Sequence, residues 1–192
     1  MKLPQGVEPL SEPLKSLYNL LVRFNQRGVV IGGIAASLLG RPRYTEDLDA
    51  MFLLSSTDEI RSFLDASANE GFEPRIKDVL DFAKKNRVVL LRHIESDTPI
   101  DISLGILPFE EEMVERSKLH HFDGLIVRLP TPEDLIIMKA VAHRPKDLED
   151  IRNIVVKHPD IDIDRIEYWV KAFAELLELP DLWGQISKIL EG

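Results

Sequence analysis

Two aspartates, Asp47 and Asp49, are the clearest candidates for chemistry in this sequence. The apolar residues around them predict a β-strand from 47 to 54, and on a strand the side chains at positions i and i+2 share one face. Carboxylates placed so close together repel each other unless a cation lies between them. Oxygen ligands without histidine or cysteine nearby suit a hard cation, so we expect Mg²⁺ or Mn²⁺ at this pair.

A pair of glycines, Gly32 and Gly33, follows a short apolar strand predicted at 29–31 and begins a helix that ends before Gly40. The first backbone N–H groups of a helix have no partner within it and can receive an anion such as a phosphate. A Gly–Gly pair can also serve close backbone packing alone. The nearby aspartates favour the phosphate interpretation, because a cation held there would contact the same phosphates.

A third carboxylate, Asp101, lies in a strand predicted at 100–104, with isoleucine on both sides. A buried carboxylate is costly without a partner, so Asp101 needs either a metal ion or an arginine or lysine neighbour. Since two other acids are available, we expect Asp101 to complete the metal site.

Lys139 lies in the apolar part of a helix predicted at 132–143, and Asp147 lies in the first turn of the next helix. The lysine can be a surface residue whose ammonium group extends to solvent, or a cation that contacts the outer phosphates of a nucleotide. Asp147 can be functional, or it can simply complement the helix dipole. The residue pattern leaves both questions open.

The elements that must position these residues change character near residue 130. Before it, predicted strands at 29–31, 47–54, 88–93, 100–104 and 125–129 alternate with helices at 11–25, 34–39, 57–69, 76–86 and 108–117. After it, helices are predicted at 132–143, 146–157, 164–178 and 181–190. We therefore predict an α/β (α+β) chain, with a mixed domain that includes an N-terminal helix over residues 1–129 and a helical domain over 130–192.

Three local details accompany this assignment. We expect Ser11 and Thr57 to cap their helices, and His120 and His121 to lie in an exposed turn.

Composition excludes several classes of protein. The chain has 192 residues, of which 44% are apolar and none is cysteine, so disulfide scaffolds, zinc fingers and thiol nucleophiles are ruled out. No apolar run approaches the roughly 18 residues of a membrane span, and the N-terminus lacks the apolar core of a signal peptide, so we expect a cytoplasmic protein without a membrane partner. The net charge of -9 argues against extensive coating of a nucleic-acid backbone.

Taken in order, the candidate residues resemble the minimal nucleotidyltransferase superfamily. The matching residues are Gly32-Gly33, Arg43-Tyr44-Thr45-Glu46-Asp47-Leu48-Asp49, Asp101, Lys139 and Arg144-Pro145-Lys146-Asp147. The chain is most similar to the AbiEii-type toxin nucleotidyltransferases, whose pattern has Gly-Gly or Gly-Ser, Arg-x-Thr-x-Asp-x-Asp, a third Asp, a Lys and a final Lys-Asp. The order of all these pieces over residues 29–150 is more specific than any one of them.

The resemblance implies a nucleotidyltransferase palm, which is a mixed sheet flanked by helices, with a helical domain over the nucleotide. It also implies that Asp47 and Asp49 hold two divalent ions, one of them shared with Asp101 to lower the pKa of an acceptor hydroxyl.

The resemblance assigns the other matched residues to the nucleotide. The Gly32 and Gly33 amides and Lys139 would orient and neutralise the triphosphate. Asp147 would position Lys139 or the nucleotide. Arg43 and Thr45 would belong to the nucleotide-binding residues, and they would brace the loop that presents the acids.

We therefore expect an enzyme that uses Mg²⁺ to transfer a nucleoside monophosphate from an NTP to an acceptor hydroxyl, in a toxin-like or defence role. An RNA end, such as that of tRNA, is one candidate acceptor, and an antitoxin protein is a candidate partner. A small-molecule or protein hydroxyl stays open, because an acidic chain suits RNA only if its basic residues form a patch. The basic residues that could form it are Arg41, Arg43, Lys84, Lys85 and Arg87.

Two other classes of function compete with this one. The first is a nucleotide-binding regulatory module on the same fold without catalysis, and the second is a structural interaction protein. The presence of all three acids and the lysine favours the enzyme.

Overall fold

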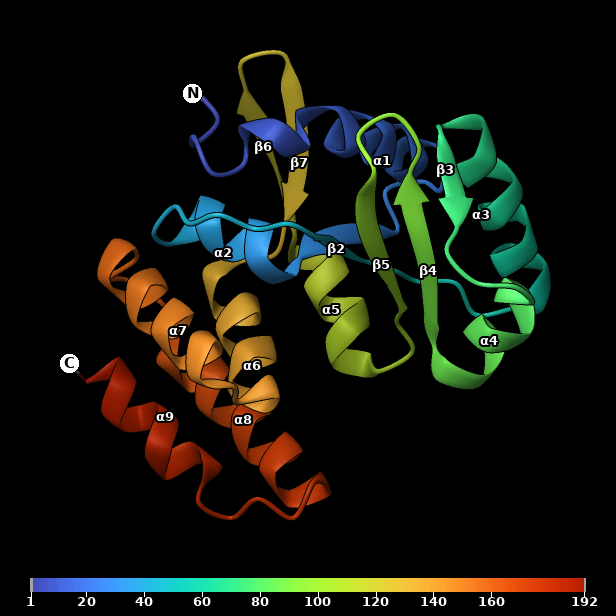
Figure 1. Cartoon of the computed structure of the whole chain (residues 1–192). Helices are drawn as coiled ribbons and strands as arrows, with labels where there is room; N and C mark the ends of the chain where they lie inside the picture. The colour runs from blue at the N-terminus through green and yellow to red at the C-terminus, as the bar shows by residue number, and fades with distance from the viewer. Residues whose placement is uncertain (1, 192) are drawn as a thin grey trace.

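The computed structural model describes residues 2–191 and contains a five-stranded mixed sheet, helices around it and a group of helices below it (Figure 1). The sheet has the strand order β1-β2-β5-β4-β3, formed by β1 (Gly28–Ile31), β2 (Leu48–Phe52), β3 (Phe72–Pro74), β4 (Val88–His93) and β5 (Thr98–Leu104). The predicted mixed α/β fold with a sheet flanked by helices is confirmed.

Helices and a hairpin complete the architecture. In the first part of the chain they are η1 (Glu8–Leu10), α1 (Ser11–Arg23), α2 (Gly32–Leu39), α3 (Thr57–Asn69), α4 (Val79–Asn86), α5 (Pro108–Arg116) and the hairpin β6 (Lys118–Phe122) with β7 (Leu125–Leu129). The later helices are α6 (Pro132–Ala142), α7 (Pro145–Lys157), α8 (Ile163–Leu176) and α9 (Leu182–Leu190). In the described part of the chain, none of these helices combines the length and apolar character needed to cross a membrane.

The pairing of β2 with β5 places two candidate acids side by side. These strands are parallel, and their register sets Asp49 opposite Asp101. Along β5 the side chains alternate, so Ile100 and Ile102 are buried while Asp101 is half-buried on the other face. The isoleucines that flank Asp101 in sequence therefore point away from it, and the carboxylate is left free to face a cavity.

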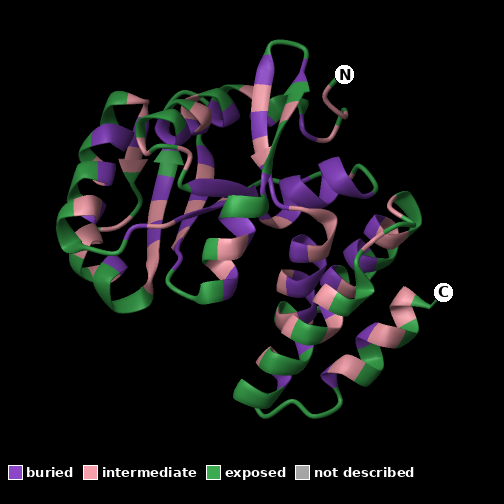
Figure 2. Cartoon of the chain, turned by 180° about the vertical axis from the view of Figure 1, so that it is seen from behind, coloured by how far each residue is buried: buried purple, intermediate pink, exposed green. Residues whose placement is uncertain are grey.

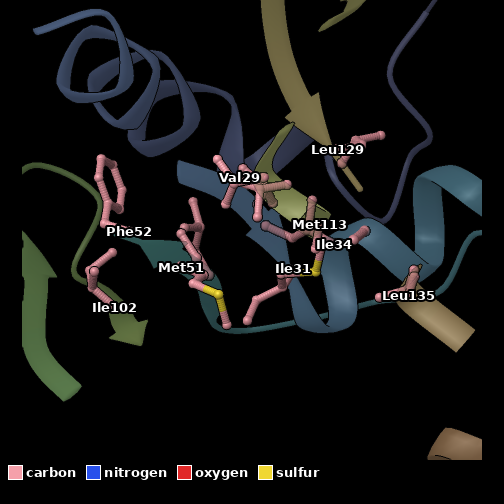
Figure 3. Packing of buried hydrophobic residues seen from close by; sticks show 14 of the residues in the cluster. Val29, Ile31, Ile34, Met51, Phe52, Ile102, Met113, Leu129 and Leu135 are labelled. Carbon is pink, nitrogen blue, oxygen red and sulfur yellow. The ribbon is translucent and has the colours of Figure 1, made fainter. Parts of the chain in front are cut away.

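A buried core holds these strands in place. Phe52 at the end of β2 packs against Phe63 of α3 with ring centroids 4.8 Å apart, and both side chains are fully buried. Figure 3 shows Val29, Ile34 and Met113, which belong to the same buried cluster and come from β1, α2 and α5. Removing a large side chain from such a core costs about 3–5 kcal/mol, so the strand ends are held firmly.

The short helix α2 is buried on nearly every side (Figure 2). Its small residues let it pack against β1, β2 and the helices α6 and α7. A helix that is apolar all round belongs in a protein interior. Its N-terminal turn is therefore fixed rigidly beside the strand that carries Asp49.

The helix α6 begins at a strong local signal and is anchored by buried charges. Thr131 accepts a hydrogen bond from the Asp134 backbone N–H, and a proline follows at the first helical position. The fully buried carboxylate of Asp134 accepts hydrogen bonds from Arg116 at 3.3 Å and Arg165 at 2.8 Å. This cluster joins α5, α6 and α8, and so fixes the helix that carries Lys139.

The structure corrects two element predictions. The helix expected from 76 begins at Val79, because residues 72–74 form β3, which pairs with β4, and Asp78 takes a left-handed backbone with φ 54°. His120 and His121 do not lie in a turn; they belong to β6, whose backbone pairs with β7. In both strands the cross-strand hydrogen bonds override an unfavourable local sequence.

The predicted helix caps were wrong by a residue or more. Ser11 lies within helical structure, because the turn η1 runs directly into α1. The cap of α3 is Ser56, and not Thr57: its hydroxyl accepts a hydrogen bond from the Glu59 backbone N–H at 3.1 Å. The Glu59 carboxylate in turn accepts the backbone N–H of Ser56 at 3.1 Å. This reciprocal arrangement is a capping box.

The Glu59 side chain gives a pH-dependent prediction. Its hydrogen bonds from Arg27 and Ser55 lower its pKa from 4.5 to about 2. The contribution of the carboxylate to stability is therefore complete above pH 4.5 and is lost as the pH falls towards 2. We expect Glu59→Gln to lower the free energy of unfolding by about 1 kcal/mol at pH 7 and by clearly less at pH 3. Urea unfolding at both pH values measures this, and an equal loss at both would contradict it.

Candidate active site

A cavity of about 300 Å³ lies where β2, β5, the start of α2 and the connection between α6 and α7 meet. In Figure 1 these elements come together between the sheet and the lower helices. All nine candidate catalytic, metal-binding and nucleotide-binding residues line it: Gly32, Gly33, Arg43, Thr45, Asp47, Asp49, Asp101, Lys139 and Asp147. The lining thus joins residues that lie far apart in the chain.

The three aspartates Asp47, Asp49 and Asp101 line this cavity from the sheet, and we call them the acid wall. Burial raises the pKa of Asp49, and the charges of Asp47 and Asp101 raise it further, while the Gly33 backbone N–H and Lys146 act in the opposite direction. The ionised form of the Asp49 carboxylate is therefore disfavoured in this environment. A cation beside it would relieve this.

Asp101 also has a cationic neighbour in the structure. Its carboxylate forms an ion pair with Arg75, which follows β3. The arginine partner that the sequence left open is therefore present. Among residues 2–191, no three acidic or histidine side chains already stand at the spacing of a metal site. Arg75 contacts one of the two carboxylate oxygens of Asp101, so a cation at Asp101 would share the carboxylate with Arg75 or displace it.

Contact with the acid wall restricts position 32 to glycine. Its φ of +65° lies in the left-handed region, and a Cβ built on it would overlap the Asp49 carboxylate. The backbone N–H of the next residue, Gly33, acts on the same carboxylate and lowers its pKa. The first turn of α2 therefore meets Asp49 directly, which only glycine at position 32 permits.

We expect Gly32→Ala to lower the free energy of unfolding by far more than the left-handed backbone at position 32 alone would cause. The control is Gly124→Ala, because Gly124 has φ +75° but nothing within 4 Å of its Cβ position. The control should lose about 1 kcal/mol of stability, and Gly32→Ala should lose at least about 2 kcal/mol more because the clash is added. Thermal or urea unfolding measures both. Equal losses in the two variants would show that contact with Asp49 does not constrain this position.

Thr45 and Arg43 hold the loop that precedes β2. The Thr45 hydroxyl contacts the Asp47 carboxylate at 2.8 Å and the Asp47 carbonyl oxygen at 3.2 Å. The Arg43 guanidinium donates two hydrogen bonds, at 3.1 and 3.2 Å, to Asp150 of α7. Thr45 thus orients an acid of the wall, and Arg43 ties the loop to the helical part.

Lys139 does not extend to solvent. Only 5% of the residue is exposed, and its ammonium group donates to Asp147 at 3.2 Å and to Asp150 at 2.7 Å. Burial acts to raise the pKa of Asp147, but hydrogen bonds from Arg144 and Lys139 outweigh it, and the pKa is lowered. Asp147 is therefore held in its ionised form, and both acids are hydrogen-bonded to a buried lysine.

Four residues at or beside the cavity were given no role from the sequence, although two of them, Arg144 and Lys146, belong to the matched motif. Arg144 and Lys146 line it, Arg75 reaches it through Asp101, and Asp150 joins Lys139 to Arg43. A signal for Asp150 was present, because it lies three residues after Asp147 and so on the same face of α7. For Arg75 the sequence offered no such signal.

Solved structures place the fold among nucleotidyltransferases. An antigenic nucleotidyltransferase-like protein from Paracoccidioides brasiliensis is 18% identical, with a TM-score of 0.58 over 98% of this chain and 95% of its own. The antibiotic-resistance factor ANT(2'')-Ia in solution is 15% identical, with a TM-score of 0.57 over 91% of this chain and 95% of its own. A crystal structure of ANT(2'')-Ia in complex with adenylyl-2''-tobramycin is 17% identical, with a TM-score of 0.52 over 85% of this chain and 95% of its own. At these identities the likeness shows a shared nucleotidyltransferase-like fold.

The sequence itself identifies the family. Residues 10–178 match the family described as "Nucleotidyltransferase of unknown function (DUF6036)". The chain belongs to this nucleotidyltransferase family, and the predicted superfamily is confirmed. No curated protein matches the chain.

Proposed function

We propose that this chain transfers a nucleoside monophosphate from an NTP to an acceptor hydroxyl in the cavity described above. The observation that carries the proposal is the division of the cavity lining by charge. The acid wall comes from the sheet and the loop before it, whereas the helical part contributes Arg144, Lys146 and the buried Lys139, together with one acid, Asp147. A nucleoside triphosphate with a divalent cation has the matching distribution of charge.

The acid wall fits a divalent cation by its chemistry. Its donors are all carboxylate oxygens, and burial with like charges already disfavours ionised Asp49. Asp47, Asp49 and Asp101 would hold Mg²⁺ or Mn²⁺. When bound, the ion would neutralise the triphosphate and lower the pKa of the acceptor hydroxyl.

The chain's own groups would orient the nucleotide. The amides of Gly32 and Gly33 begin α2 and carry the positive end of its dipole, which suits a phosphate. Arg43 and Thr45 would keep the loop and the acid wall in place, and Lys139 with Asp147 would complete the opposite side. These two residues come from the helical part, so we also propose that residues 130–192 act as a unit beside the palm of residues 1–129.

The reaction would proceed by direct displacement. The acceptor oxygen forms a bond to the α-phosphorus while the bond between that phosphorus and the bridging oxygen to the β-phosphate breaks. Pyrophosphate leaves, and the hydroxyl proton is released. The protein would contribute mainly by positioning and by electrostatic stabilisation of the triphosphate.

Two acceptor classes have support. The motif similarity to AbiEii-type toxins favours an RNA end, a defence role and an antitoxin partner. ANT(2'')-Ia was solved with adenylyl-2''-tobramycin, a nucleotide joined to a small molecule, which favours a small-molecule hydroxyl. The proposed basic patch is weakened, because Arg43 pairs with Asp150 and Arg87 donates to the Leu104 carbonyl oxygen at 3.0 Å. An RNA acceptor would therefore be held at a small site near its end.

One assay tests these alternatives. The chain is incubated with Mg²⁺, each α-labelled NTP and either a tRNA pool or an aminoglycoside, beside Asp101→Asn. Label on tRNA supports the RNA acceptor, and label on the aminoglycoside supports the small molecule, provided that Asp101→Asn loses it. Binding of NTP without transfer would favour the regulatory module. The absence of both NTP binding and nucleotide transfer would contradict the proposed function.

A further inference from the structure

Lys139, the lysine that the motif assigns to the triphosphate, is already neutralised. Its ammonium group contacts two carboxylates, those of Asp147 and Asp150, and its side chain is 6% exposed. Both acids are themselves buried. Turning Lys139 towards a phosphate would break both contacts and leave each buried acid with only an arginine partner, Arg144 for Asp147 and Arg43 for Asp150. Lys139 is therefore poorly suited to direct contact with the substrate.

Lys146 has the opposite character. It is exposed, it lines the same cavity, and its side chain makes no hydrogen bond or ion pair with any residue in the range 2–191. The three carboxylates of the acid wall line the same cavity. An ammonium group that faces the acid wall without being paired to it is free to contact an incoming anion.

The position of Lys146 in its helix adds a second argument. It lies in the first turn of α7, after Arg144 at the N-cap and Pro145. A cation at a helix N-terminus is unfavourable, because it faces the positive end of the helix dipole. For Arg144 this is offset by Asp147, which accepts its guanidinium N–H at 2.6 Å. For Lys146 no such compensation exists within the described residues, and an anion in the cavity would supply it.

We propose that Lys146, and not Lys139, is the cation that contacts the outer phosphates of the NTP. Lys139 then serves the site indirectly, by holding Asp147 and Asp150 and through Asp150 the loop that carries Arg43. This assignment rests on the proposed function, since it names which residue recognises the triphosphate. Asp147, which follows Lys146 in the sequence, pairs with Arg144 and Lys139 and not with Lys146.

The test compares a triphosphate with a monophosphate. Titration calorimetry in Mg²⁺ buffer measures binding of α,β-methylene-ATP, which cannot transfer its nucleotide, and of AMP. We expect Lys146→Met to weaken binding of the triphosphate by about 10- to 100-fold, the usual effect of losing a charge-assisted hydrogen bond, and to change AMP binding by less than about threefold. Lys146→Arg should restore most of the loss.

A matched control removes the same charge elsewhere. Lys188 is exposed on α9 and outside this cavity, so Lys188→Met should leave both affinities unchanged. If Lys146→Met binds the triphosphate as tightly as the wild-type chain, or weakens both ligands equally, the assignment is overturned while the proposed function stands. If the wild-type chain binds neither nucleotide, the proposed function fails and this assignment fails with it.

Discussion

Asp49→Asn should abolish nucleotide transfer while making the metal-free protein harder to unfold. Asp49 stands at the centre of the acid wall, opposite Asp101 in the neighbouring strand and two residues from Asp47. An amide cannot replace a carboxylate in neutralising a divalent cation, so we expect the transfer rate to fall at least about a thousandfold.

The stability effect follows from the raised pKa of Asp49. A carboxyl group whose pKa is higher in the folded state than in the unfolded state weakens folding once the pH exceeds the unfolded value. At pH 7 the variant removes this unfavourable charge. We expect a gain of about 1 kcal/mol, or ~2–4 °C in Tm, with EDTA present.

Two measurements and one control test this prediction. Thermal unfolding in EDTA and label transfer in Mg²⁺ are compared for the wild-type chain, Asp49→Asn and Asp65→Asn. Asp65 is exposed on α3, so its substitution removes the same charge away from the cavity and should change neither quantity. A variant at position 49 that keeps its transfer rate, or that unfolds at a lower temperature than the wild-type chain in EDTA, would contradict this account of the acid wall.

Asp150→Ala should cause the largest loss of stability at the site, about 3–5 kcal/mol. The Asp150 side chain is 6% exposed and accepts hydrogen bonds from Lys139 at 2.7 Å and from Arg43 at 3.1 Å. Removing the carboxylate leaves a buried ammonium group with one partner and detaches the loop of Arg43 from α7. Transfer should fall together with stability, because the same loop presents Asp47.

Urea unfolding at pH 7 measures this loss, with Glu149→Ala as the control. Glu149 is the exposed neighbour on the same helix, and its substitution should cost less than about 0.5 kcal/mol. The double variant Lys139→Met with Asp150→Leu should recover part of the loss, since it leaves no buried charge at position 139. A loss below about 1 kcal/mol in Asp150→Ala would show that the network does not hold the two parts together.

The parts of the site that could be predicted from sequence are those set by local spacing. The i and i+2 aspartates lie close together whenever residues 47–49 are extended. The alternation of side chains along the strand at 100–104 puts Asp101 on one face and the flanking isoleucines on the other. Likewise Thr131 and a following proline mark the start of α6. Local periodicity and cap chemistry decide all of these features.

The parts that could not be predicted depend on long-range pairing. Asp150 meets Arg43 across 107 residues, and Asp101 meets Arg75 across 26. No spacing rule relates such positions, because the tertiary packing of α7 and the turn after β3 brings them together. The polar strand β6 was missed for the same reason, since its partner β7 supplies the backbone hydrogen bonds. The boundary between the two predicted domains at residue 129 and the roles of the cavity residues stay predictions.

The proposed function requires that this cavity transfer a nucleotide and release pyrophosphate. Two reactions run in parallel test it, with ATP labelled at the α-phosphate in one and at the γ-phosphate in the other, together with Mg²⁺ and the accepted acceptor. We expect the α-label to become attached to the acceptor and the γ-label to appear in pyrophosphate at the same rate. Transfer of the γ-label to the acceptor, or release of the γ-label as inorganic phosphate with no α-label on any acceptor, would contradict it.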